Sequence, residues 1–551
     1  MLASERCLML PEMVDKIISF LDKNDQITCL RINSTWRDLA FPHTFNRALS
    51  YSRSFERRIE DLLNQPLAQE ALIRNSGHIR NVYTGTSGLL PVLIAAPLCT
   101  NLVSLECNLS ESARDVIEML GPFIRKNPNL ICVELFGVPY TINLEQLVQA
   151  LQSCSGLTRL LLEYQFEHGV CSRGLASLIR GLAYPHLRLK DLHLDMLVNA
   201  PDQGLALFEA DRENSSPLFP DLTLFIFHNW HRHCQQVAEV FYLPVLREAP
   251  ELTCLFVPEM SDSLTAVAAA VIATQKPPLQ GIYFGSEISR PGFVDIIKTC
   301  RRTLRALNAE DTICCEPMLR QLLPTNNDAT DLTNLQSIKI GLEESPTVSA
   351  LIQKILTSLS SLKCFMVLRS CPPSANQYPA RLQIRDMVAT PWTCVGLQEL
   401  CLFLGSYTAY EDEIETQQER RTKIGQVYKQ LGVLTQLKRL ELSCNVLGGP
   451  SEVELDFTLE SGVQAMEPCL KSLTSLDIRN VAGSRISQSE REWVLRHGPQ
   501  LQNNDDLSLY VSMLPMVGNK FSEWEPEWVT LYAPQLKTLA DGRNLIHECM
   551  F

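Results

Sequence analysis

Residues 156–163 read GLTRLLLE, and within them Leu157, Leu160 and Leu162 form the six-residue frame L-x-x-φ-x-φ, where φ is apolar and x is any residue. Side chains of an extended strand alternate between its two faces. Leu160 and Leu162 therefore share one face, and Arg159 and Leu161 share the other. The frame predicts a short strand that buries its φ residues and presents its x residues on the opposite face.

The same frame returns along most of the chain at intervals of about 25–40 residues. Between the frames lie apolar helical stretches, such as residues 144–151, 175–182 and 348–359. One strand and one helix cannot bury their apolar surface alone, so neighbouring repeats have to stack. The frames begin at Leu102, Leu130, Leu157, Leu189, Leu222, Leu252, Leu279, Leu304, Leu335, Leu362, Leu397, Leu437 and Leu473, with weaker candidates at residues 78–83 and at Leu536.

This alternation of a short strand and a helix resembles leucine-rich repeats. The resemblance implies an α/β fold, an irregular leucine-rich-repeat solenoid with a parallel sheet on its concave face. The alternative is an α-solenoid of short helices, but six-residue runs filled with β-branched and aromatic residues favour strands. Three spacers are too long or too polar for plain repeats and are predicted insertions, namely residues 199–220, 370–391 and 411–421.

A different pattern precedes the array, at residues 10–45, LPEMVDKIISFLDKNDQITCLRINSTWRDLAFPHTF. Pro11 suits the first turn of a helix, and apolar residues then recur at helical spacing up to Leu21. Asp25 can cap a second helix, and Trp36 lies in the apolar stripe of a third. Three short helices of about 40 residues bury little apolar surface, so we expect them to depend on a partner or on the following domain.

These residues resemble an F-box, through Leu10-Pro11-Glu12, residues 17–22 (IISFLD) and residues 36–39 (WRDL). In that family the three helices bind the small Skp-type adaptor of cullin–RING ubiquitin ligases. The resemblance assigns adaptor contact to six residues, Leu10, Pro11, Ile17, Leu21, Ile32 and Trp36.

Three positions depart from the family pattern. Gln26 stands where Leu is usual, Asn33 where Cys is usual, and Phe45 replaces a common second Trp. Gln26 and Asn33 are polar, so they are predicted to weaken adaptor binding. The alternative interpretation of this stretch is an ordinary helical cap on the repeat array.

The predicted domains follow from these two patterns. Residues 1–47 form the F-box-like helical domain, and residues 48–84 a helical linker with a first degenerate repeat. Residues 85–505 form the leucine-rich-repeat solenoid, and residues 506–551 form a C-terminal capping segment that contains Trp524 and Trp528.

Composition narrows the classes of function. The net charge is −13 with scattered basic residues, which argues against nucleic-acid and anionic-membrane partners. No secretory signal is apparent at the N-terminus, and the 19 cysteines form no CxxC pair, so we expect a reducing cytoplasmic or nuclear location. His228 to Cys234 crowds its candidate ligands into seven residues without a second pair, so no metal site and no cofactor is predicted.

The x residue between the two φ positions should form a column across the sheet. In chain order the column reads Glu106, Glu134, Leu161, His193, Ile226, Phe256, Tyr283, Asn308, Lys339, Met366, Cys401, Glu441 and Asp477. Its ends are acidic and its middle is apolar. Protein interfaces favour buried aromatic anchors, so Ile226, Phe256 and Tyr283 are the predicted substrate-binding residues. The alternative is that an insertion covers this part of the sheet or that it is simply buried.

Together the resemblances imply a substrate-recognition subunit of a Skp/cullin/F-box ubiquitin ligase. The helical domain would bind a Skp-family adaptor and through it a cullin, and the array would bind a protein substrate. Such a subunit has no catalytic residues, and the chain carries no phosphate-binding, serine-hydrolase, zinc-protease or kinase motif. The alternative function is a leucine-rich-repeat interaction scaffold outside any ligase, and an enzyme on a repeat scaffold is a third class.

Overall fold

The structure is a computed structural model of the 551-residue chain, which divides into two compact units, Met1–Leu252 and Thr253–Phe551. Predictions on Leu10, Asn33 and Phe45 lie outside the described residues, and so do those on residues 48–65, 199–216, 229–234, 370–381, 411–416 and 506–551. The structure describes residues 11–21, 23–29, 32, 35–36, 39–40, 66–84, 89–110, 112, 114–139, 142–164, 172–183, 186–195, 217–228, 241–258, 260–285, 290–324, 332, 334–342, 346–368, 382–405, 417–444, 458–479 and 488–503.

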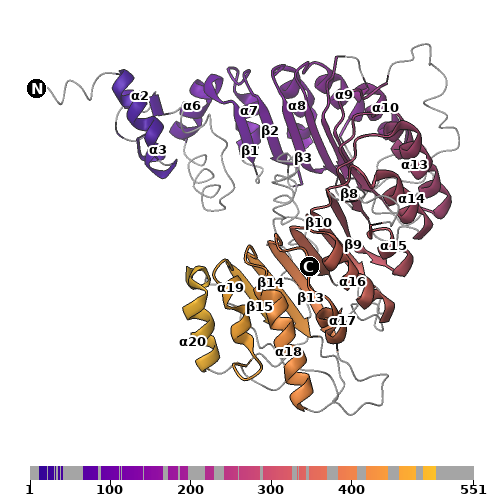
Figure 1. The fold of residues 1–551 in the computed structure, drawn as a ribbon. Coiled ribbons are helices and arrows are strands. Elements are labelled where there is room, and N and C mark those ends of the chain that lie inside the picture. The colour runs from indigo at the N-terminus through magenta and orange to yellow at the C-terminus, as the bar shows by residue number, and fades with distance from the viewer. Residues whose placement is uncertain are drawn as a thin grey trace, which may run out of the picture. The chain divides into compact units, whose positions relative to one another are not determined.

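The first unit begins with two short helices and continues as alternating strands and helices (Figure 1). Its described strands are parallel and lie side by side in chain order. The elements are α2 (Pro11–Phe20), α3 (Lys23–Cys29), α6 (Pro66–Asn75), η1 (Ser76–His78), β1 (Asn81–Thr84), α7 (Leu89–Ala95), β2 (Ser104–Asn108), α8 (Arg114–Arg125), β3 (Cys132–Val138), α9 (Leu144–Gln152), β4 (Arg159–Tyr164), α10 (Ser172–Leu182), β5 (Asp191–Asp195), β6 (Leu224–His228) and α12 (Leu243–Arg247).

The second unit repeats the plan with parallel strands in the order β7-β8-β9-β10-β11-β13-β14-β15, and β12 pairs with β13. The predicted α/β class with parallel strands is confirmed in both units. The elements are β7 (Cys254–Val257), α13 (Asp262–Gln275), β8 (Gly281–Phe284), α14 (Arg290–Cys300), β9 (Ala306–Cys314), α15 (Glu316–Arg320), β10 (Ser337–Leu342), α16 (Pro346–Ser358), β11 (Cys364–Leu368), β12 (Leu382–Gln383), α17 (Ile384–Ala389), β13 (Glu399–Gly405), α18 (Gln417–Gly432), β14 (Arg439–Cys444), η3 (Val463–Met466), α19 (Glu467–Leu470), β15 (Ser475–Arg479), α20 (Gln488–His497) and η4 (Pro499–Asn503).

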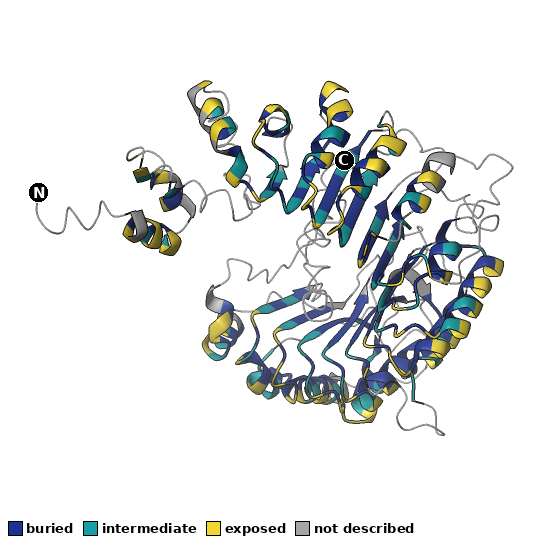
Figure 2. Cartoon of the chain, turned by 90° about the horizontal axis from the view of Figure 1, so that it is seen from above, coloured by how far each residue is buried: buried dark blue, intermediate teal, exposed yellow. Residues whose placement is uncertain are grey.

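A strand begins within every one of the thirteen predicted frames, two residues after the leading leucine. The leading leucines are at most 2% exposed, because each fills the space between its strand and the adjoining helices. Buried residues gather where helices meet the sheet, and exposed residues line the outer surface of the helices (Figure 2). Full burial of one such side chain stabilises the fold by about 1.5–3 kcal/mol.

The structure describes residues 382–391 of the predicted insertion at residues 370–391. Its described end contains β12 and α17, an additional strand–helix pair. The prolines of this segment obscure its apolar residues in the sequence. Leu382, Ile384 and Met387 are nevertheless all buried in the structure. The weak strand predicted at residues 78–83 is confirmed as β1, and the polar run at residues 411–421 leads into α18 from Gln417 onwards.

Polar side chains also connect successive repeats where loops leave the helices. Asn127 is fully buried: its Nδ2 donates to the carbonyl oxygens of Cys99 at 3.1 Å and Phe123 at 3.0 Å, and its Oδ1 accepts from the Leu102 N–H at 3.0 Å. One amide thereby satisfies three backbone groups that would otherwise be buried without partners.

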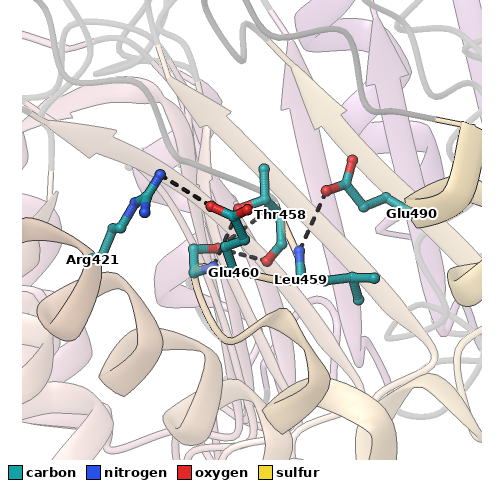
Figure 3. Close-up of polar contacts among 6 residues, drawn as sticks. Arg421, Thr458, Leu459, Glu460 and Glu490 are labelled. Carbon is teal, nitrogen blue, oxygen red and sulfur yellow. Dashed lines mark hydrogen bonds and ion pairs between the residues drawn. The ribbon is translucent and has the colours of Figure 1, made fainter. Parts of the chain in front are cut away.

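A second polar connection lies near the C-terminal end of the described array (Figure 3). Arg421 on α18 pairs with Glu460 at 3.3 Å, and the Leu459 N–H donates to Glu490 Oε1 on α20 at 3.3 Å. The Ser461 hydroxyl donates to the Thr458 carbonyl at 2.7 Å and holds the turn between them. These contacts order the segment that enters η3.

We expect Leu157→Ala to lower the free energy of unfolding by about 2–5 kcal/mol, because it leaves a cavity at a fully buried frame position. Urea unfolding of the full chain, followed by far-ultraviolet circular dichroism, measures the change. Met119→Ala on α8 removes a side chain that is 48% exposed and should shift the free energy by less than about 0.5 kcal/mol. Equal effects of the two substitutions on the free energy of unfolding would contradict the stabilising role of the buried frame leucines.

Candidate functional site

The N-terminal helices have a small apolar core of their own. Val14 and Ile18 of α2 pack with Cys29 of α3 and with Ala40, and all four are at most 4% exposed. Leu21, Trp36 and Leu39 are partly buried against this core. We call residues 11–40 the N-terminal module. Helix α2 begins at Pro11, whereas α3 begins at Lys23, so Asp25, the predicted cap of the second helix, lies within its first turn.

The N-terminal module also carries large apolar side chains that face solvent. Phe20 is 80% exposed, Ile32 54% and Met13 47%. Such side chains gathered on about 30 residues are characteristic of a surface that binds another protein. Sequence reasoning missed Met13 and Phe20, although they lie seven residues apart and therefore on one side of α2.

The six predicted adaptor contacts occupy different environments. Ile32 is exposed, whereas Ile17, Leu21 and Trp36 are half-buried, and Leu21 and Trp36 also contact the module's core. Pro11 is the first residue of α2. Of these residues, Ile32 is therefore the one most accessible to a partner.

Gln26, one of the positions that depart from the F-box pattern, faces the inside of the module. It is 4% exposed, and its Nε2 donates to the carbonyl oxygens of Ile18 and Leu21, each at 3.0 Å. The carbonyl groups of a helix C-terminus lack partners within the helix, so the Gln26 amide caps α2. The Gln26 amide therefore stabilises the fold of the N-terminal module. The Gln26 side chain is not part of the module's exposed surface.

The second candidate surface is the sheet face formed by the x residues, which we call the x-face. In the first unit, strand register places Glu106 beside Glu134, Glu134 beside Leu161, and Leu161 beside His193. In the second unit, register aligns the predicted residues from Phe256 to Asp477 in one column across seven strand pairings. The predicted column is therefore confirmed within each unit.

Carboxylates are concentrated on the x-face of the first unit. Glu134 is 2% exposed, and its Oε1 forms an ion pair at 2.8 Å with Nε of Arg159, which lies on the next strand. Asp191 is the register partner of Arg159, and Asp195 is the register partner of Glu163. We call this group the acid face; its members are Glu134, Glu163, Asp191 and Asp195, with Arg159 and Leu161 among them.

Burial and mutual repulsion change the protonation of the acid face. Loss of water, together with the smaller effect of the nearby Asp195 carboxylate, raises the pKa of Glu163 from 4.5 to about 8. Burial also raises the pKa of Asp191, although Arg159 and Lys190 oppose the shift and Glu134 adds to it. Strongly shifted carboxyl groups that share one surface are typical of functional sites.

On the x-face of the second unit, the Phe256 and Tyr283 rings stack with their centroids 5.0 Å apart. Phe256 is 5% exposed and Tyr283 is half-buried, so Tyr283 is the more accessible member of this stack. Ile226 lies on β6 of the first unit and is half-buried. Farther along the second unit, Cys364, Met366 and Cys401 form a separate buried apolar cluster.

The described residues hold no group of three or more His, Cys, Asp or Glu side chains that could bind a metal ion. Burial raises the pKa of the Cys99 thiol to about 11 and that of Cys300 to about 12, so neither is a reactive thiolate near neutral pH. No described helix has the length and apolar character needed to cross a membrane.

A comparison of the chain with protein-family models and with curated proteins found no match.

The free energy of unfolding should fall as pH rises from about 4.5 to 8, because folded Glu163 keeps a proton that the unfolded chain has released. Glu163→Gln removes this contribution, so the variant should lose less stability than the wild type between these pH values. Urea unfolding at a series of pH values measures the difference. Glu145→Gln, at an exposed position on α9, should retain the wild-type pH profile, and a Glu163→Gln profile that also matches it would contradict the shift.

Proposed function

We propose that this chain is the substrate-recognition subunit of a Skp/cullin/F-box ubiquitin ligase. The observation that carries the proposal is the N-terminal module, which has its own core and still exposes Phe20 and Ile32. An isolated helical cap would turn such side chains toward the array it shields. Exposed apolar groups on a self-contained module instead favour docking to another protein.

The array behind the module suits a receptor of this kind. We assign it to the irregular leucine-rich-repeat solenoids, because thirteen frames each give a buried leucine and a parallel strand. In such a solenoid the x-face is the concave surface and offers side chains from many strands to one partner. In the second unit, the aromatic stack of Phe256 and Tyr283 is a proposed apolar contact for a protein substrate, and in the first unit Ile226 is another.

The proposed subunit is not itself an enzyme and needs no cofactor. Its contribution is proximity, because a substrate held on the array reacts within the same assembly as the ubiquitin-transferring subunits. The proposed location is cytoplasmic or nuclear, where these ligases act. The adaptor would contact Leu10, Pro11, Ile17, Leu21, Ile32 and Trp36, together with the exposed Phe20.

Co-expression with a Skp-family adaptor, followed by affinity purification of the full chain, tests the proposal. The wild type should recover the adaptor in equal amount, and Phe20→Asp/Ile32→Asp should reduce recovery by about tenfold or more, because charge opposes burial of an apolar interface. Both positions are exposed, so the variant should keep the wild-type fold.

Met119→Asp/Val433→Asp is the matched control, since it adds the same charge at exposed apolar positions outside the N-terminal module. It should retain the adaptor. A folded wild-type chain that recovers no adaptor would refute the ligase proposal and favour the alternative, an interaction scaffold that uses the same array.

A further inference from the structure

The x residues of the second unit are more buried than their own sheet explains. The helices of this unit lie on the other side of the sheet, where the φ residues pack (Figure 1). A sheet face that no other layer covers leaves the ends of its long side chains in water. The x residues on five strands, β7, β9, β10, β11 and β13, are nevertheless at most 7% exposed, namely Phe256, Asn308, Lys339, Met366 and Cys401.

Lys339 shows this excess burial most clearly. Register places Asn308 and Met366 beside it, and Ser337 and Gly341 flank it along β10. A lysine side chain is longer than any of these four, so they enclose its stem but not its charged end. Lysine normally keeps that end in water, yet Lys339 is 7% exposed. Another part of the chain therefore lies over it.

The extent of the burial limits which part of the chain supplies this cover. From β7 to β13 the sheet has five strand pairings, which span about 24 Å. The segment 406–416 between β13 and α18 is joined to the array at both ends, so its 11 residues reach no more than about 18 Å. Residues 369–381, between β11 and β12, contain no acidic residue that could neutralise Lys339.

The chain beyond η4 has the reach that these segments lack. The element η4 ends at Asn503 and follows β15, which is four pairings away from β10 in the sheet. Four pairings correspond to about 19 Å. The 17 residues between Asn503 and Phe521 extend up to about 55 Å. A segment that begins at Phe521 can therefore reach the whole buried region.

Residues 521–530, FSEWEPEWVT, also match this face in chemistry. They combine Trp524 and Trp528 with three glutamates. Aromatic rings pack on apolar side chains and attract cations, and carboxylates form charge-assisted hydrogen bonds with an ammonium group. On β8–β11, Lys339 is the one charged residue in the two rows of x residues whose other members are Gly281, Tyr283, Ala306, Asn308, Ser337, Cys364 and Met366.

We propose that residues 521–530 lie over the x-face of the second unit and compete there with the substrate. In this arrangement the two tryptophan rings cover the apolar x residues, and a neighbouring glutamate pairs with Lys339. The inference rests on the proposed function, because it assigns regulation to the face that is proposed to bind the substrate. A substrate has to displace this segment, so its apparent affinity falls in proportion to the fraction of chains whose x-face is open.

Lysine acetylation of the full chain, measured by mass spectrometry, tests the proposal. In the wild type, Lys339 should react more slowly than Lys429, which is exposed on α18. Trp524→Ser/Trp528→Ser should raise the rate at Lys339 by about tenfold or more, because this rate follows the fraction of chains whose x-face is open. The rate at Lys429 and the free energy of unfolding should stay at their wild-type values. An unchanged rate at Lys339 would overturn the proposal.

Tyr407→Ser/Tyr410→Ser is the matched control, since it removes two aromatic side chains from the segment 406–416. It should leave Lys339 protected, and faster acetylation of Lys339 in this variant would identify the wrong segment and overturn the proposal. Carbodiimide cross-linking of the wild type should join Lys339 to Glu523, Glu525 or Glu527. A link from Lys339 to Glu411, Glu413 or Glu415 in their place would also overturn it.

The two proposals can fail independently. Trp524→Ser/Trp528→Ser should recover the Skp-family adaptor as the wild type does and should retain more of the proteins that the array binds. Adaptor recovery with Lys339 unprotected in the wild type would reject the internal competitor and retain the ligase subunit. Protection of Lys339 by residues 521–530 without adaptor recovery would reject the ligase subunit and retain the cover.

Discussion

Burial of the leading leucine of each frame is the constraint on which the rest of the structure depends. Each leucine packs where a strand meets its helices, and none is more than 2% exposed. Because this packing recurs thirteen times, it fixes where thirteen of the described strands begin and which of their side chains reach the x-face. The polar anchor Asn127 adds to this packing, since it satisfies buried backbone groups where the chain passes from one repeat to the next.

The same constraint explains why charged groups on the x-face lose contact with water. Parallel strands about 4.8 Å apart hold the side chains of one column against each other, so even Glu134 and Asp191 are almost fully buried. Burial strengthens each charge interaction because water screens it less.

The strands could be predicted from the sequence because a leucine at a fixed distance ahead of two alternating apolar residues is a local signal. The short pair β12 and α17 could not, because neighbouring prolines concealed three buried apolar residues. The structural role of Gln26 could not be predicted either, since only the folded module shows its amide capping α2. The acid face was missed because Glu134, Arg159 and Asp191 come from three strands, and register alone brings them together.

Ubiquitination of proteins bound by the array tests the central claim most directly, that one part of the chain binds the ligase and the other binds its substrate. Proteins recovered with the wild type and with Phe20→Asp/Ile32→Asp would be compared for amount and for attached ubiquitin. The account predicts that the variant retains the same proteins in larger amount and with less ubiquitin. Bound proteins that are equally abundant and equally ubiquitinated with both chains would contradict it.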